Sequence, residues 1–194
     1  MPAPPILQQI YRAHIEHFGE PDCSVVYDDS NRSIVFDRPK KIDRFPSCIE
    51  VLTWYPDNEC DMTTFATIGM ASVPLPKASH RAELHFAFRM SLEQSQIGDV
   101  SCFLANLAMY PFQIGEPIDW WHTLSHPGEI PLFSTAKCLL LHPRFVKEGW
   151  DSIATDEGDV HILNAVPITK EEKDLRIVSA ILDRLSEVDI FEPR

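Results

Sequence analysis

The fold is decided by one stretch of the chain, Thr67-Ile-Gly-Met-Ala-Ser-Val-Pro-Leu-Pro-Lys-Ala-Ser-His-Arg-Ala-Glu-Leu-His-Phe-Ala-Phe-Arg89. Gly69 can take a positive φ angle or let another backbone come close, so it marks the point where a first strand stops. Pro74 and Pro76 keep the following connection out of a helix and out of a central strand. The stretch therefore predicts the end of one strand, a turn and a second, longer strand.

Strict alternation of apolar and polar side chains predicts the longer strand. Residues spaced by two lie on the same face of a strand, so the pattern is typical of a half-buried strand. The apolar face carries Ala82, Leu84, Phe86 and Phe88, and the polar face carries Arg81, Glu83, His85 and Arg89. We interpret the polar face as a salt-bridged surface, and a binding or acid–base surface is the alternative.

Apolar residues at intervals of three and four predict amphipathic helices on either side of this region. The first helix begins at Pro4 and Pro5 and ends at Gly19, because proline is well tolerated in the first turn and glycine commonly ends a helix. Its two histidines, His14 and His17, are interpreted as solvated or at the rim.

Two further helices are predicted in the second half of the chain. One is capped by Ser91 and stopped by Pro111. The last follows a capping box, Thr169-Lys-Glu-Glu172, and has an apolar face from Leu175 to Leu185.

The remaining β-prone runs occur in groups and do not alternate with helices. Residues 25–27 and 33–36 suggest a hairpin. Residues 47–55 carry apolar side chains at both odd and even positions, so both faces of this strand are expected to be covered, which predicts a central strand. Further strands are expected at residues 62–68, 136–142 and 160–166, the last ended by Pro167. This order predicts an α+β fold, with helices packed on a mixed, largely antiparallel sheet.

Composition indicates one ordinary globular domain. The 194 residues are 44% hydrophobic and 24% charged, enough apolar side chains for a substantial core. The sequence has no apolar run long enough for a membrane span and no secretory signal pattern. Its five cysteines are scattered, which favours a reducing cytoplasm over a disulfide framework.

The formal net charge is −12. This argues against binding nucleic acid or an anionic membrane through a broad basic face. It is compatible with electrostatic steering toward a basic partner, and the alternative is that it serves only to keep the protein soluble.

The common catalytic motifs are missing from the sequence. It has no glycine-rich phosphate loop, dinucleotide fingerprint, nucleophile elbow or metalloprotease motif. We therefore expect no enzyme activity, no cofactor and no metal. The alternative is a metal-dependent hydrolase using the region of His122 and His126, whose spacing of four is that of a helical zinc pair, although Thr123 replaces the expected glutamate and Pro127 disfavours a helix there.

The central stretch resembles the signature of the Suppressor of Fused (Sufu) domain family. The resemblance is carried by Thr67-x-Gly69-Met70, a proline-containing loop and Arg81-Ala-Glu83-Leu84, with Ala71 where the family usually has serine. Further similar segments follow in family order over nearly the whole chain: Pro4-Pro5-Ile-Leu, Leu107-Ala-Met-Tyr-Pro-Phe-Gln113, Trp120-Trp121, and Asp159-Val-His-Ile-Leu-Asn-Ala-Val-Pro-Ile-Thr169.

This resemblance implies a single Sufu-like domain over residues 1–194. Animal members sequester transcription factors, and single-domain bacterial members are associated with polymorphic toxin systems as immunity proteins. We therefore expect a cytoplasmic bacterial protein that binds and neutralises a toxin partner with a basic surface. A scaffold subunit is a further alternative.

Partner-binding candidates are aromatic and acidic residues, because aromatic anchors dominate many interfaces and acidic groups complement a basic cleft. They are Trp120, Trp121, Asp119 and an acidic turn of Asp57, Glu59 and Asp61. The family-signature residues Gly69, Met70, Arg81 and Glu83 are candidates for either a structural or a functional role.

Overall fold

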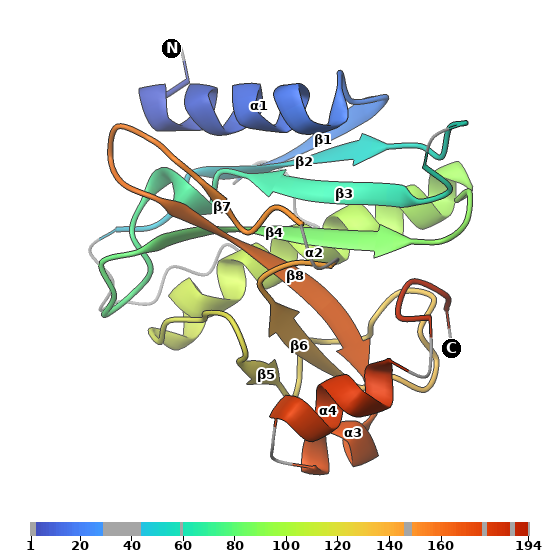
Figure 1. Ribbon diagram of the computed structural model, residues 1–194. Coiled ribbons are helices and arrows are strands. Elements are labelled where there is room, and N and C mark those ends of the chain that lie inside the picture. Colours follow the sequence, from blue (N-terminus) through green and yellow to red (C-terminus); the bar gives the residue numbers. More distant parts are fainter. Residues whose placement is uncertain are drawn as a thin grey trace.

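The computed structural model describes residues 3–28, 44–58, 60–145, 149–175, 178–186 and 189–193. Its centre is one sheet with the strand order β1-β2-β3-β4-β8-β6-β5, and β7 pairs with β8 beside this path (Figure 1). Neighbouring strands are antiparallel except for β4 and β8, which are parallel. The predicted α+β fold with a mixed, largely antiparallel sheet is confirmed. The strands are β1 (Cys23–Asp28), β2 (Cys48–Trp54), β3 (Thr63–Ile68), β4 (Arg81–Phe88), β5 (Thr123–Leu124), β6 (Cys138–His142), β7 (Ser152–Ile153) and β8 (Val160–Ile168).

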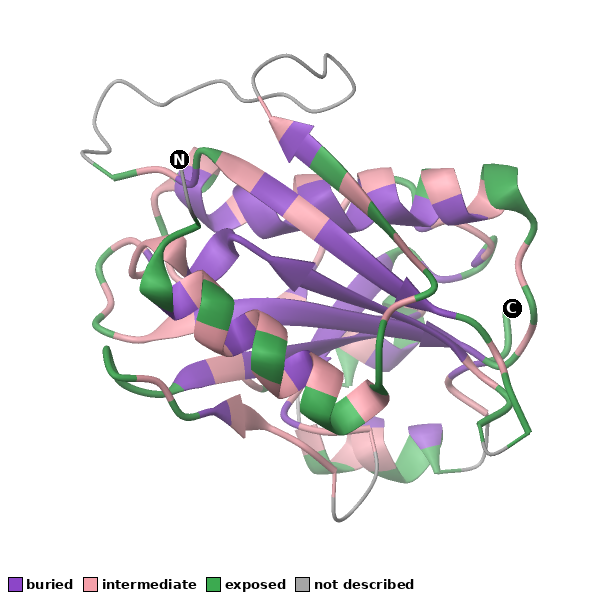
Figure 2. Ribbon diagram, turned by 90° about the horizontal axis from the view of Figure 1, so that it is seen from above, coloured by how far each residue is buried: buried purple, intermediate pink, exposed green. Residues whose placement is uncertain are grey.

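Helices cover both faces of the sheet. Helix α2 packs on one face, and α1 and α4 pack on the other over different strands (Figures 1 and 2). Strand β8 shows the division, because Leu163 belongs to the α2 core, whereas Ile162 packs with α1 and Ile168 with α4. The helices are α1 (Pro5–Phe18), α2 (Gln94–Ile114), α3 (Lys170–Asp174) and α4 (Val178–Leu185), with a 3₁₀ turn η1 (Met70–Ser72).

Strand β4 is buried on both faces, so the prediction of a half-buried strand was wrong. Figure 2 shows the central strands buried along most of their length. Glu83 is 0% exposed and His85 3% exposed. Their face is covered by α1 and η1, so these side chains are bonded to protein groups and do not form a salt-bridged surface.

Helix α2 differs from its prediction at both ends. Glu93, not Ser91, caps it through a capping box with Gln96. Pro111 lies inside the helix, which ends at Gly115 in the left-handed conformation. Proline removes one hydrogen bond of the helix but did not stop it.

The C-terminal segments also differ in detail. Strand β8 continues through Pro167, which pairs with Leu139, beyond the point where its ladder with β4 ends. The capping box of Thr169 and Glu172 is confirmed at the start of α3. The last helix is divided into α3 and α4, and Leu175 is 42% exposed, so it is not part of the buried face.

The structure describes only the first strand of the hairpin predicted from residues 25–27 and 33–36. Strand β1 pairs with β2, for example Val25 with Val51, and residues 33–36 lie outside the described residues. The central position predicted for residues 47–55 is confirmed, since β2 lies between β1 and β3. The five cysteines are free thiols. Within the described residues, no helix has the length and hydropathy needed to cross a membrane.

Candidate functional site

The segment after α2 is fixed to β6 by backbone hydrogen bonds. The N–H of Trp121 donates to the carbonyl of Leu141 over 2.6 Å, and the N–H of Leu141 donates to the carbonyl of His122 over 2.9 Å. A turn is closed by the N–H of His122, which donates to the carbonyl of Asp119. These bonds hold the residues from Asp119 to His122 in place beside the start of β4 and β8.

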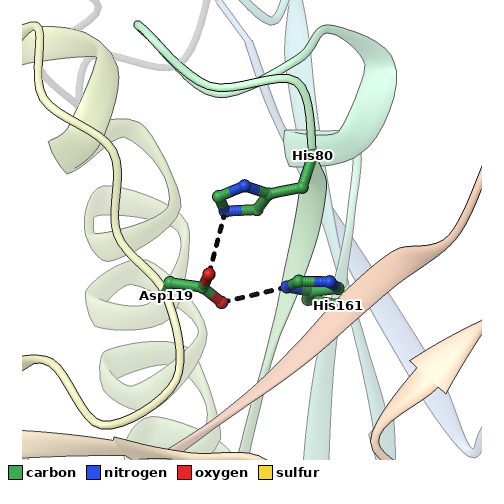
Figure 3. A group of neighbouring side chains, drawn as sticks. All are labelled: His80, Asp119 and His161. Carbon is green, nitrogen blue, oxygen red and sulfur yellow. Dashed lines mark hydrogen bonds and ion pairs between the residues drawn. The ribbon is translucent and has the colours of Figure 1, made fainter.

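Asp119 lies between two histidines that come from distant parts of the sequence (Figure 3). Its Oδ1 atom is 2.9 Å from Nδ1 of His161, and its Oδ2 atom is 3.7 Å from Nε2 of His80. His80 precedes β4 and His161 is the second residue of β8. The parallel register places Ala82 beside His161, and alternation puts residue 80 on the same face as residue 82, so both imidazoles reach the same carboxylate.

Trp120 supports this group from the side. Its indole stacks on the ring of His161 with a centroid separation of 4.1 Å and an angle of 13°. The indole Nε1 donates to the carbonyl of Ile162 over 2.9 Å, and the backbone N–H of Trp120 donates to Oδ1 of Asp119 over 2.8 Å. The indole therefore fixes the His161 ring, and the backbone fixes the carboxylate.

Asp119 is held as a carboxylate. Partial burial by itself raises its pKa, but the hydrogen bonds from His161 and Trp120 and the nearby imidazoles outweigh burial, and the net pKa is below its usual range. The side chains of His80 and His161 are each 22% exposed and that of Asp119 is 33% exposed. The group can therefore exchange ions and water with the solvent.

Trp121 points to a different environment from its neighbour. It is 40% exposed, its φ angle is 70°, and its ring meets that of His142 edge to face. Trp120 instead packs against the core. The two adjacent tryptophans therefore face different surroundings, one against the core and one toward solvent.

The acidic turn lies at the opposite end of β4. Asp57 closes the turn by accepting the N–H of Cys60 over 2.8 Å, and Asp61 forms an ion pair with Arg89 over 2.6 Å. Glu59 lies outside the described residues. Because Arg89 follows β4 and His80 precedes it, the candidate residues divide into two groups separated by the length of this strand.

The family-signature residues build the turn after β3. Oε1 of Glu83 accepts the N–H groups of Gly69 and Ala71 over 2.8 and 3.0 Å, and Oε2 accepts the hydroxyl of Thr67 over 2.6 Å. Burial raises the pKa of Glu83 to about 7, against these hydrogen bonds, which lower it. Met70 is fully buried. These contacts give Gly69, Met70 and Glu83 structural roles.

Arg81 extends the same network to the surface. It donates to the carbonyl of Ala71 over 2.9 Å and forms an ion pair with Glu157 over 2.6 Å. The carboxylate of Glu83 holds the N–H of Ala71, and Arg81 holds its carbonyl. A side-chain hydroxyl at residue 71 is not needed for this turn.

A buried histidine pair joins α1 to the sheet. His14 is 0% exposed, so its interpretation as a solvated or rim residue was wrong, whereas His17 is exposed. Its Nδ1 lies 2.8 Å from the carbonyl of Ile10, which can only accept, so Nδ1 carries the proton. Its Nε2 therefore accepts from Nε2–H of His85, 2.9 Å away. Trp54 and Trp150 surround the pair.

His122 and His126 do not form the metal pair considered from their spacing. They flank the extended residues of β5, so helical spacing does not apply to them. Nδ1 of His122 accepts the N–H of Asp119 over 3.2 Å. Within the described ranges, the one group of three or more potential ligands that are close together is His80, Asp119 and His161.

A surface groove of about 920 Å³ lies between α2 and residues 127–137. Its lining includes Asp99, Cys102, Asn106 and Lys137. None of the residues of the His–Asp–His group lines it.

The sheet, its helices and the turn built on Glu83 define a Sufu-like α+β domain. A family model described as Suppressor of fused protein (SUFU) matches residues 46–187. The chain therefore belongs to the Suppressor of fused protein family. No curated protein sequence matches it.

Solved structures share the fold, among them the following three. A SUFU homologue from Neisseria gonorrhoeae has a TM-score of 0.63 and 15% identity, covering 96% of this chain and 93% of that one. The structure of the Sufu–Fu complex has a TM-score of 0.60 and 14% identity, covering 97% of this chain and 86% of that one. Drosophila Suppressor of Fused has a TM-score of 0.55 and 14% identity, covering 96% of this chain and 48% of that one.

Proposed function

We propose that this chain is a non-catalytic protein-binding domain that acts as an immunity protein by covering a basic toxin domain. The observation that carries the proposal is Trp121, an exposed tryptophan on a segment fixed to β6. Tryptophan is enriched in binding hot spots. Its segment is already ordered, so little conformational entropy is lost when a partner binds.

Charge supports a basic partner. The net charge of −12 favours encounter with a positively charged surface. Asp119 lies two residues before Trp121, and Trp120 orients it, so these three residues form the centre of the proposed surface. Asp57 and Asp61 lie at the other end of β4, and we assign them, together with Glu59 of the same acidic stretch of sequence, to electrostatic steering.

Among the described residues, the ionisable groups whose pKa values are shifted most have structural surroundings, which supports a non-catalytic role. Glu83, His14 and His85 are buried and bonded to backbone or side chains of the packed sheet and α1. Their pKa shifts follow from burial in structural roles. The large groove beside α2 is lined by other residues.

The relatives are compatible with this role. One similar structure is a complex of Sufu with Fu, and the similar chain from Neisseria gonorrhoeae is covered over 93% of its length. By the same proposal, residues 1–194 act as a single domain in the cytoplasm, a reducing compartment in which the five free cysteines stay reduced.

The test is capture of the partner from the native host with the tagged wild-type protein and with Trp121→Ala. We expect one stoichiometric basic protein that is toxic when expressed alone and harmless when expressed with this chain. Trp121→Ala should lose at least about 2 kcal/mol of binding free energy, the size of a hot-spot residue.

Val26→Ala is the matched control. Val26 is 52% exposed but lies on β1, the edge of the sheet farthest from β5 and β6. It should retain wild-type affinity. Equal affinity of Trp121→Ala and wild type would show that Trp121 is not part of the interface. A captured protein that is not toxic would contradict the immunity role.

A further inference from the structure

The geometry points to a binding site for a divalent transition-metal ion, such as Zn²⁺, formed by His80, Asp119 and His161. The ligand atoms of the three side chains lie within 4.8 Å of one another. Two imidazole nitrogens and one carboxylate oxygen form a donor set that suits Zn²⁺ and its first-row neighbours. Figure 3 shows the carboxylate between the two rings.

The separations of the ligand atoms are close to those that one ion requires. Zinc binds imidazole nitrogen and carboxylate oxygen at about 2.0–2.2 Å, which places tetrahedral ligand atoms about 3.3 Å apart. The distance from Oδ1 of Asp119 to Nδ1 of His161 is 2.9 Å, and that from Oδ2 to Nε2 of His80 is 3.7 Å, so one oxygen–nitrogen separation is shorter and the other longer than this value. Nε2 of His80 is the more distant atom, and it also lies 3.3 Å from the carbonyl oxygen of Ile118, a contact that binding of the ion would replace.

The surroundings fix two of the three ligands. The indole of Trp120 lies flat on the His161 ring, and the Trp120 N–H holds the carboxylate of Asp119. Such outer contacts commonly orient metal ligands. His161 lies on β8, and His80 immediately precedes β4, the strand that pairs with β8 in parallel.

The nature of the donors selects the class of metal. Calcium takes six to eight oxygen ligands and magnesium prefers oxygen in octahedral geometry, so a site with two nitrogens suits neither. The partial exposure of all three side chains leaves a path for the ion. Three protein ligands leave at least one coordination position for water or another donor.

The experiment is a calorimetric titration of metal-free, untagged protein with ZnCl₂, repeated with CoCl₂ while the visible spectrum is recorded. We expect one equivalent of metal per chain and cobalt absorption without a thiolate charge-transfer band. The variants His80→Gln, Asp119→Asn and His161→Gln should each weaken binding by more than the roughly 10- to 100-fold that is typical for loss of an outer contact.

His126→Gln is the control, because His126 is exposed and outside the group. Its affinity should equal that of wild type. Circular dichroism of each metal-free variant separates loss of ligand from loss of fold. The site is refuted by absence of binding, by undiminished affinity in the three ligand variants, or by a thiolate band that assigns the metal to cysteine. None of these readouts depends on a protein partner, so the metal site and the proposed function are tested separately.

Discussion

Gly69 shows at the scale of one residue how tightly the turn after β3 is packed. Its φ angle is 129°, and a Cβ atom at this position would lie 2.3 Å from the carbonyl oxygen of Cys48. Its N–H is also held by the buried carboxylate of Glu83. The position therefore needs glycine both for its backbone conformation and for the close approach of β2.

We predict that Gly69→Ala lowers the free energy of unfolding by at least about 2 kcal/mol, because backbone strain and a steric clash add together. Urea denaturation followed by circular dichroism measures the change. Gly128→Ala is the control, since Gly128 has a φ angle of 94° but no neighbouring atom within 4 Å of the added Cβ. It should lose only about 1 kcal/mol from backbone strain. An equal loss in both variants would show that the clash with Cys48 has no effect.

Helix α2 contributes more buried residues to the core on its face of the sheet than any other helix or strand described. It contributes buried side chains along its length, including Val100, Leu104, Leu107 and Phe112. Gly98 lies near its beginning, and a Cβ atom added there would meet no neighbouring atom within 4 Å. This glycine adds flexibility to the unfolded chain without any packing requirement in the folded one.

We predict that Gly98→Ala stabilises the protein by up to about 1 kcal/mol, since alanine has the higher helix propensity. The expected result is a higher urea midpoint, with no change in the slope of the unfolding free energy against urea concentration. A lower midpoint would mean that α2 requires glycine at this position. The same glycine-to-alanine change is thus expected to raise the free energy of unfolding at residue 98 and to lower it at residue 69.

Much of the element order follows from local sequence. Alternation and helical spacing are local patterns, and they predicted α1, β4 and the capping box of α3. The predictions that Pro111 stops a helix and Pro167 ends a strand were wrong, because whether proline ends an element depends on neighbouring segments that the local sequence does not show. The burial of Glu83 and His85 was missed for the same reason, since the helix α1 that covers their face is far away in the sequence.

The candidate site was predicted only in part. The pattern of Asp119, Trp120 and Trp121 was visible because these residues are consecutive. His80 and His161 are 81 positions apart, and no local pattern connects them. Only the parallel register of β4 and β8 brings them together, so a correct strand pairing was the missing signal.

At the scale of the whole molecule, the buried histidine pair couples α1 to the sheet and makes stability depend on pH. Burial lowers the pKa of His14 to about 4, and burial together with His14 and His17 lowers the pKa of His85 well below its usual value. The unfolded chain takes up these protons near pH 6.5, whereas the folded chain resists them. Folding stability is therefore lost as the pH falls from about 6.5 to about 4.

We predict a loss on the order of 3 kcal/mol from His14 across this window. His14→Gln, which cannot take up a proton there, should show a flatter dependence of the urea midpoint on pH. Glu83 acts in the opposite direction, because its pKa is raised to about 7 and its protonation favours the folded state as the pH falls. Since Glu83 is present in both proteins, its contribution cancels, and the difference reports His14 together with its effect on the pKa of His85. Parallel pH profiles would contradict the prediction.

The parallel pairing of β4 with β8 also sets the order in which the chain can fold during synthesis. Arg81 pairs with Val160, which is 79 positions later. At roughly 5–20 residues per second, a ribosome needs several seconds to supply β8 after β4 is made. Throughout this interval one edge of an apolar strand lacks its neighbour, and such edges promote aggregation. We therefore expect the nascent half-sheet to be more prone to aggregation than the finished domain.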